Sequence, residues 1–312
     1  MTEFSNVAVI GGGIMGSGLA THFAANDVNT TVIEHRESNV VDAKKRIKES
    51  VRFLRSETGT DISQESVFEN LSFTLDPTTG VANVGLVLET ISENLDAKRA
   101  VFRDIANATD DGTVLASNTS GIPITEIADG VPEAADRIIG CHWWNPPYLM
   151  PLVEVIKGEE TAVETVDQVT TFVESVNRDP IVVNRDVPGF VWNRIQFAVL
   201  RECMHLVEED VASLEDVNKA VRDGYALRTA VVGPFETVDL SGLELFQTIA
   251  GNLYPELSDA DDPSRIFDEY LAEGRPGVEE GAGFFEYDRS GEEVVYQRDE
   301  TIAALREVLS QE

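Results

Sequence analysis

Residues 6–16 read Asn-Val-Ala-Val-Ile-Gly-Gly-Gly-Ile-Met-Gly, and a helical pattern continues from there to residue 26. The first five residues have the continuous apolar pattern of a buried strand. Gly11 permits a tight turn, Gly13 lets the backbone approach a pyrophosphate, and Gly16 lets a helix pack closely on the strand. The helix N-terminus would then face the phosphates. Strand, glycine spacing and helix together predict a dinucleotide-binding site.

A second apolar run, residues 30–34, ends in Glu34, which lies 18 residues after Gly16. This is close to the spacing at which a carboxylate binds the ribose hydroxyls of NAD. Arg36 could meet the 2′-phosphate of NADP, but the nearby Glu34 would repel that phosphate. We therefore expect NAD as the cofactor. The alternative is that Glu34 is only an exposed acid at the end of a strand.

The first half of the chain alternates strands and helices in a doubly wound, Rossmann-like α/β pattern. In such sheets, ligands bind beyond the carboxyl ends of the strands. Glu93, the Ser-Asn-Thr-Ser run at residues 117–120 and His142 are all expected there, although the 117–120 run could instead only cap the next helix. The remaining strands are expected at residues 84–88, 113–116, 137–142, 152–156 and 179–183, with helices at 95–107 and 123–128.

Turn-forming residues at 184–189 mark a boundary, and from Phe190 onward the hydrophobic pattern has a helical period. We predict an NAD-binding domain over residues 1–186 and an all-α domain over residues 187–312. The helices expected in the second domain run from residue 193 to about 210, from 214 to 221 and from 240 to 249.

His142 ends an apolar strand pattern, and Glu154 lies among the aliphatic residues of the next one, with three prolines between them. If the two strands pair, Glu154 can hold the proton of one ring nitrogen and leave the other nitrogen free to accept a proton from an alcohol. This pattern predicts a general base. The alternative is a histidine buried only for packing.

The formal net charge is −32, from 56 acidic and 24 basic residues, and it is spread over nearly every expected helix. Such a surface repels nucleic acid and anionic membranes. Spread charge favours adaptation to salt, so we predict a protein from a halophile; calcium binding is the weaker alternative because no acidic loop has the required spacing. The sequence has only two cysteines, no apolar leader and no run long enough to span a membrane, so we predict a cytoplasmic protein. The four histidines lack metal-ligand spacing, so we expect no bound metal.

Lys44, Lys48, Arg52 and Arg55 are expected on one face of a helix in this otherwise acidic chain. They could receive an anionic group such as the phosphates of coenzyme A. Equally, they could form a solvated face that is paired with neighbouring acids.

In combination, several motifs resemble the short-chain-length group of NAD-dependent 3-hydroxyacyl-CoA dehydrogenases. The superfamily of that group also contains dehydrogenases of hydroxy acids without CoA, such as L-gulonate and carnitine dehydrogenases. The resemblance covers nearly the whole chain. It rests on the glycine motif at 11–16, Glu-Thr-Ile-Ser-Glu-Asn-Leu-Asp-Ala-Lys at 89–98, Ser-Asn-Thr-Ser at 117–120, His-Trp-Trp-Asn-Pro at 142–146, Leu-Val-Glu at 152–154, residues 186–194 and Gly-Pro-Phe-Glu at 233–236.

The resemblance implies a role for each matching residue. His142 would be the base and Glu154 its orienting partner, while Ser120 and Asn193 would donate hydrogen bonds to the substrate oxygen. Glu93 and Lys98 would lie near the nicotinamide. The resemblance also implies that residues 187–312 are a substrate and dimerisation domain, through which a homodimer forms. The full set of expected cofactor-binding residues is Gly11, Gly13, Ile14, Met15, Gly16, Glu34, Glu93, Lys98, Asn118 and Asn145.

The resemblance implies NAD-dependent oxidation of an L-3-hydroxyacyl-CoA to the 3-ketoacyl-CoA, as in fatty-acid β-oxidation. Ser50, Lys48 and Arg52 would then bind the CoA substrate, together with Ser120 and Asn193. The Trp143–Trp144 pair and the second proline, Pro147, depart from the family pattern, and the Pro147–Tyr148 feature looks more like the hydroxy-acid relatives. The alternatives are therefore a dehydrogenase of a small hydroxy acid without CoA, or a catalytically silent dinucleotide-binding protein.

Overall fold

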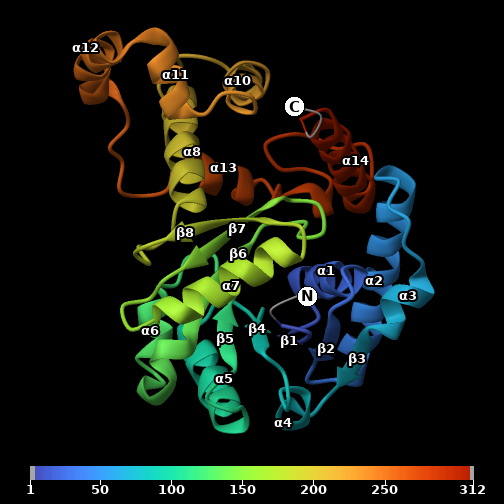
Figure 1. Cartoon of the computed structure of the whole chain (residues 1–312). Helices are drawn as coiled ribbons and strands as arrows, with labels where there is room; N and C mark the ends of the chain where they lie inside the picture. The colour runs from blue at the N-terminus through green and yellow to red at the C-terminus, as the bar shows by residue number, and fades with distance from the viewer. Residues whose placement is uncertain (1–3, 310–312) are drawn as a thin grey trace. The chain divides into compact units, whose positions relative to one another are not determined.

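The computed structural model describes residues 4–309. These residues form two compact units. The first comprises the described chain up to Arg194 together with Ile302–Ala304, and the second comprises Ile195–Thr301 and the described residues from Leu305. The first unit contains a mostly parallel sheet covered by helices, and the second is helical (Figure 1). The predicted fold class, a Rossmann-like sheet followed by an all-α domain, is confirmed.

One eight-stranded sheet forms the centre of the first unit. Its strands are β1 Asn6–Ile10, β2 Asn29–Ile33, β3 Leu71–Thr74, β4 Leu86–Glu89, β5 Val114–Ser117, β6 Ile138–Trp143, β7 Leu152–Ile156 and β8 Asp179–Val183. Their order is β3-β2-β1-β4-β5-β6-β7-β8, and every neighbouring pair is parallel except β6 and β7, which are antiparallel. The chain reverses its direction of progress across the sheet between β1 and β4, the switch point at which such folds bind ligands.

Helices cover both faces of this sheet. Phe23 and Phe172 belong to one apolar core, whereas Phe102 and Ile127 belong to the core on the other face. Accordingly, α1 and α7 lie on one side of the sheet and α5 and α6 on the other (Figure 1). The helices of this unit are α1 Ile14–Ala25, α2 Glu37–Glu57, α3 Gln64–Glu69, α4 Pro77–Gly80, α5 Leu95–Ala108, α6 Ile124–Ala128 and α7 Val163–Ser175.

The second unit consists of helices and loops. Apart from isolated bridges that link residues 277, 282 and 286, its described residues form no strand. A π-helical stretch, Val221–Ala226, joins two of its helices. The helices are α8 Trp192–Glu208, which begins in the first unit, then α9 Leu214–Ala220, α10 Leu227–Thr229, α11 Pro234–Ser241, α12 Leu243–Leu253, α13 Ile266–Ala272 and α14 Gly291–Leu309.

The single helix predicted over residues 240–249 is wrong. Two helices meet there, because α11 ends at Ser241 and α12 begins at Leu243. Gly242 between them has a φ of 96°, which an α-helix does not allow. β3 and α7 were not predicted; β3 has only four residues, three of them half-buried, and therefore lacks a continuous apolar pattern.

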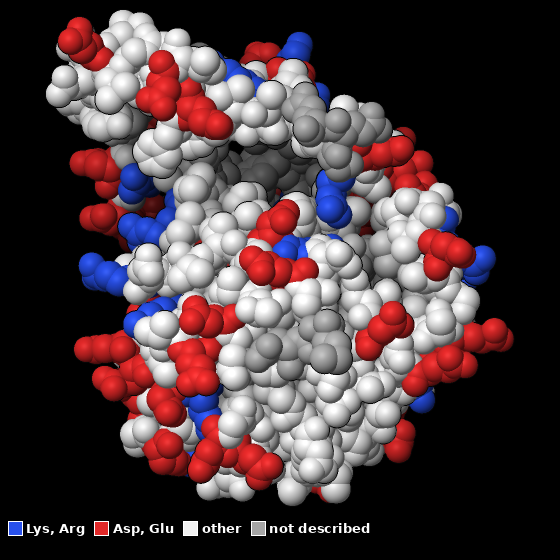
Figure 2. Space-filling model, in the orientation of Figure 1, with Lys and Arg blue, Asp and Glu red and all other residues white. Residues whose placement is uncertain are grey.

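Acidic side chains occur in many separate groups on the visible face, with fewer basic side chains among them (Figure 2). This agrees with the spread that the sequence predicts. No helix among residues 4–309 combines the length and the apolarity that crossing a membrane would require.

Candidate active site

The glycine loop between β1 and α1 is shaped for an anion. Gly11 has a φ of 95°, and a Cβ on Gly16 would collide with the Gly11 carbonyl oxygen. Gly13 caps α1 without a side chain, and the first turn of the helix carries no acid. The N–H groups of that turn can therefore bind a pyrophosphate. Ile14 is exposed beside the loop, whereas Met15 packs against the core.

Glu34 follows β2 directly, and its buried carboxylate is tied to this loop. Its Oε1 accepts a hydrogen bond from the Gly12 N–H at 2.6 Å, and its Oε2 accepts from Asn39 Nδ2 at 3.0 Å and the His35 N–H at 3.2 Å. Burial opposes ionisation, but these donors outweigh it and hold the pKa of Glu34 below its ordinary value. A fixed negative charge therefore lies where NAD would place its adenosine ribose.

His142 and Glu154 are directly opposite each other in the β6–β7 pair, so the predicted pairing of these strands is confirmed. The distance from His142 Nδ1 to Glu154 Oε2 is 2.7 Å. The side chain of Glu154 is completely buried, and that of His142 is nearly so. An ionised carboxylate accepts only, so Nδ1 carries the proton and Nε2 of the neutral ring is left as the proton acceptor.

Two backbone donors hold the other oxygen of this carboxylate. Glu154 Oε1 accepts hydrogen bonds from the Val191 N–H at 2.9 Å and the Trp192 N–H at 3.1 Å. Burial raises the pKa of Glu154, but the bonds from His142 and from these two N–H groups outweigh it, so the pKa lies below its ordinary value. Gly189 at φ 78° and Phe190 at φ 50° make the sharp turn that aims both N–H groups at Glu154.

The loop after β5 presents Ser120 at the surface, and Glu93 fixes the backbone of that loop. Glu93 Oε1 accepts hydrogen bonds from Thr119 Oγ1 at 2.6 Å, the Ser120 N–H at 3.0 Å and the Gly121 N–H at 3.1 Å. Burial raises the pKa of Glu93, yet these bonds and the charge of Lys98 lower it below its ordinary value. Glu93 is therefore an ionised anchor for the loop.

Asn193 lies next to Ser120, as expected for two residues of one site. However, its Nδ2 donates to the Ser120 carbonyl oxygen at 2.7 Å. This differs from the expectation that Asn193 donates directly to a substrate, because one of its two N–H bonds is already used to hold the loop.

Three further expected cofactor residues surround this loop. Asn118 Oδ1 accepts from the Trp143 N–H at 2.8 Å and so ties the end of β5 to the end of β6. Asn145 is exposed just after β6, before a cis peptide bond to Pro146. Lys98 is buried and paired with Glu89 at 2.8 Å. Glu89 was not singled out from the sequence, although an acid that ends an otherwise apolar strand pattern is a usable signal.

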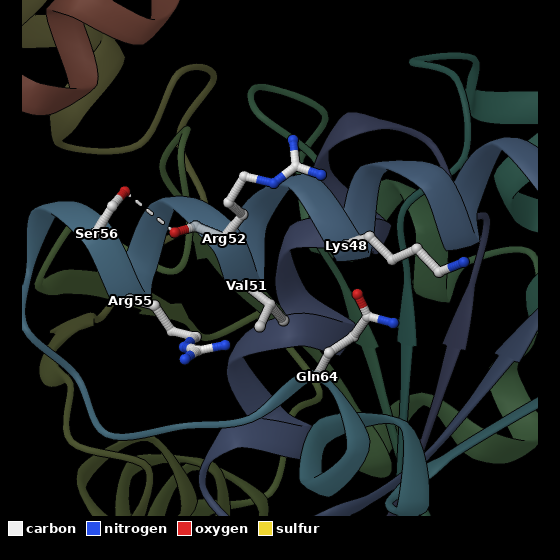
Figure 3. A pocket seen from close by; sticks show the side chains of 6 residues that line it. All are labelled: Lys48, Val51, Arg52, Arg55, Ser56 and Gln64. Atoms are coloured by element: carbon white, nitrogen blue, oxygen red, sulfur yellow. Dashed lines mark hydrogen bonds between the residues drawn. The ribbon is translucent and has the colours of Figure 1, made fainter.

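Three basic residues of α2 line a cavity of about 400 Å³ on the surface of the first unit. Lys48, Arg52 and Arg55 extend from successive turns of the helix, and Gln64 approaches from α3 (Figure 3). Ser50 is buried and does not line this cavity, so the structure does not bring it together with Lys48 and Arg52. Lys44 lies over the ring of Phe73 instead, 4.6 Å from its centroid.

Two family models match the chain. The NAD-binding domain of 3-hydroxyacyl-CoA dehydrogenase matches residues 6–187, and the C-terminal domain of the same family matches residues 189–287. The chain belongs to the 3-hydroxyacyl-CoA dehydrogenase family. The glycine loop and Glu34 fit the cofactor of this family, which is NAD.

Relatives within the family differ in substrate. A 5-formyl-3-hydroxy-2-methylpyridine 4-carboxylate 5-dehydrogenase from Mesorhizobium japonicum is 33% identical over 97% of this chain and 98% of its own. The mitochondrial hydroxyacyl-coenzyme A dehydrogenase of Sus scrofa is 32% identical over 90% of this chain and 91% of its own. An L-carnitine dehydrogenase from Streptomyces coelicolor is 34% identical over 76% of this chain and 74% of its own.

A solved structure of the pyridine-carboxylate type, described as an NAD+ dependent dismutase, superposes with a TM-score of 0.90 at 32% identity. It covers 98% of both chains. The family therefore includes relatives named for CoA thioesters and relatives named for free acids, and this chain is similar to both.

Proposed function

We propose that this protein oxidises an L-3-hydroxyacyl-CoA to the 3-ketoacyl-CoA. The observation that carries the proposal is the buried His142–Glu154 pair, which lies on the same edge of the sheet as the NAD-binding loop. An intact base and orienting carboxylate also argue against a catalytically silent dinucleotide-binding protein. When bound, NAD supplies the hydride acceptor.

In this mechanism Nε2 of His142 removes the hydroxyl proton of the substrate. Glu154 stabilises the imidazolium that forms, and its own two backbone hydrogen bonds keep the carboxylate from rotating away. The hydroxyl of Ser120 orients the reacting oxygen, with its loop held by Glu93 and Asn193. General-base catalysis of this kind contributes about 10²–10⁴-fold.

The CoA part of the proposal depends on the basic cavity of α2. Phosphates attract guanidinium and ammonium groups, and Lys48, Arg52 and Arg55 concentrate three such groups on one helix of an acidic protein. Lys48→Glu combined with Arg52→Glu should raise KM for a CoA thioester by about tenfold or more, while KM for NAD stays unchanged.

The matched control is Lys45→Glu combined with Arg103→Glu. Both residues are exposed and lie outside the cavity, and the pair makes the same change in net charge. All variants are compared at one KCl concentration at which each is shown to be folded. An unchanged KM for the thioester in the cavity variant would contradict CoA binding at α2.

A second candidate is a dehydrogenase of a free hydroxy acid or pyridine carboxylate. It is favoured by the TM-score of 0.90 with the pyridine-carboxylate enzyme and by the buried position of Ser50. NADH formation with a panel of CoA thioesters, carnitine, gulonate and hydroxymethylpyridine carboxylates separates the two. If a free acid has a higher kcat/KM than every thioester, the CoA proposal is wrong.

We further propose that the protein is a homodimer formed through its second unit. Large apolar side chains stand exposed along α8, α11 and α12, which is typical of an interface. The molar mass measured by light scattering at high KCl should be that of a dimer for the parent protein. It should be that of a monomer for the double variant Phe235→Asp, Leu240→Asp. A monomeric parent protein would contradict the proposal. The exposed residues include Ile195, Phe197, Phe235, Leu240, Leu243, Leu245, Ile249 and Leu253.

The spread of the −32 charge leads us to propose that the enzyme works in the salt-rich cytoplasm of a halophile, where counterions screen that charge.

A further inference from the structure

Glu89, the last residue of β4, is a completely buried carboxylate with four short contacts. Its Oε1 accepts from the Ile91 N–H at 2.6 Å and Lys98 Nζ at 2.8 Å. Its Oε2 accepts from Lys98 Nζ at 2.9 Å and Ser117 Oγ at 2.7 Å. Every one of these partners donates, so both oxygens of Glu89 are used by groups within the protein.

Lys98 connects this carboxylate to a second one. Its side chain is 1% exposed, and its Nζ lies 3.5 Å from Glu93 Oε2. The other oxygen of Glu93 accepts from the Thr119 hydroxyl and from the two backbone N–H groups that follow it. Glu89, Lys98 and Glu93 thus form a triad of two carboxylates and one ammonium, with a net charge of −1.

The triad lies at the carboxyl ends of β4 and β5. In the sheet, β4 is adjacent to β1, which carries the glycine loop, and β5 is adjacent to β6, which carries His142. Glu34 would hold the adenosine end of NAD near β2, and the nicotinamide end would then lie toward β4, β5 and β6. A nicotinamide ring is positively charged when oxidised and neutral when reduced.

We propose that the Glu89–Lys98–Glu93 triad favours binding of NAD+ over NADH through its net negative charge, and that Glu89 sets this charge without touching the cofactor. The effect concerns cofactor binding alone. It therefore does not depend on which substrate the enzyme oxidises, and failure of the CoA proposal would leave it intact.

The test compares the dissociation constants of NADH, measured from its fluorescence, and NAD+, measured by competition. Glu89→Gln makes the triad neutral and should raise the ratio Kd(NAD+)/Kd(NADH) by about ten- to twenty-fold, the size expected for one charge at about 10 Å and an effective dielectric constant near 20. Lys98→Gln makes the triad −2 and should lower the same ratio. A purely structural role would weaken both forms alike and leave the ratio unchanged.

The double variant Glu89→Gln, Lys98→Gln restores a net charge of −1, so its ratio should return toward that of the parent. Glu133→Gln is the matched control, because it removes one exposed carboxylate before β6, at the opposite edge of the sheet. Circular dichroism at the same KCl concentration establishes folding. If Glu89→Gln does not fold, the opposite shift in Lys98→Gln still tests the proposal. Equal ratios in the parent and the folded single variants, or shifts in the same direction, would overturn it.

Discussion

Replacing Glu154 by Gln is the most informative single change in the active site. The parent carboxylate accepts three hydrogen bonds, from His142 Nδ1, the Val191 N–H and the Trp192 N–H. An amide has the same shape but offers only one oxygen, and its other end is an NH₂ group that must face one side or the other. The substitution therefore forces a choice between the histidine and the two backbone donors.

Both choices impair catalysis. If the amide oxygen stays on Val191 and Trp192, the NH₂ group donates to Nδ1 of His142 and moves the ring proton to Nε2, where no base remains. The reverse orientation keeps the productive tautomer but leaves two part-buried N–H groups facing an NH₂ group. Each unsatisfied group costs about 1–3 kcal/mol, so this orientation is unfavourable by about 2–6 kcal/mol. At about 1.4 kcal/mol per factor of ten, kcat should fall between about 30-fold and about 10⁴-fold.

The assay is NADH formation at saturating NAD and fixed KCl, with the NADH dissociation constant measured in parallel. We expect kcat to fall as stated while cofactor binding changes by less than about twofold, because the substitution lies on β7 and not on the glycine loop. Glu160→Gln, an exposed acid shortly after β7, is the matched control. If kcat of Glu154→Gln stays within about tenfold of the parent, the tautomer argument is refuted.

Four further outcomes are expected. His142→Gln should lower kcat by at least about 10²-fold with NADH binding intact, and unchanged turnover would remove His142 from the mechanism. NAD should exceed NADP in kcat/KM because Glu34 repels a 2′-phosphate, and Glu34→Gln should narrow the difference; better use of NADP by the parent would contradict this. The unfolding midpoint should rise with KCl, since the screening length falls from about 10 Å at 0.1 M to about 3 Å at 1 M, and a flat series would refute salt adaptation. The pKa values of Glu34, Glu93 and Glu154 lie below their ordinary value of 4.5, so the free energy of unfolding should fall as the pH drops below about 4.5. Unfolding curves measured at a series of acidic pH values test this expectation. A free energy of unfolding that does not change down to about pH 3 would contradict it.

The parts of the fold that could be predicted are those in which local pattern and burial agree. β1 after Asn6 and β4 before Glu89 are apolar because both faces of a parallel sheet are covered, and such runs are visible in the sequence. The pairing of His142 with Glu154 could also be predicted, because two short strands joined by a proline-rich turn are adjacent in sequence. Their register follows from the need to bury the aliphatic neighbours of both residues.

Other features depend on contacts that no local pattern reveals. The break between α11 and α12 occurs at a single residue, Gly242, which has a positive φ. A glycine within a helical pattern does not by itself indicate a positive φ, so the break could not be predicted. The position of Ser50 could not be inferred, because a serine on an amphipathic helix fits either face; the structure buries it. Glu89 was overlooked because its side-chain partners, Lys98 on α5 and Ser117 at the end of β5, converge on it only in the folded sheet, and no local pattern shows this.

Glu154 owes its position to the sheet and to the turn that follows β8. β7 is antiparallel to its neighbour β6, and this direction places Glu154 opposite His142. On the other side of β7, β8 is parallel to it. The chain leaving β8 then turns through Gly189 and Phe190, so that the next two N–H groups point back at the same carboxylate. A residue held in a left-handed conformation costs about 1–3 kcal/mol when it is not glycine, as at Phe190. That turn brings the Val191 and Trp192 N–H groups to the buried carboxylate of Glu154, which would otherwise have only His142 as a donor. These two hydrogen bonds stabilise the buried charge and offset the conformational cost at Phe190.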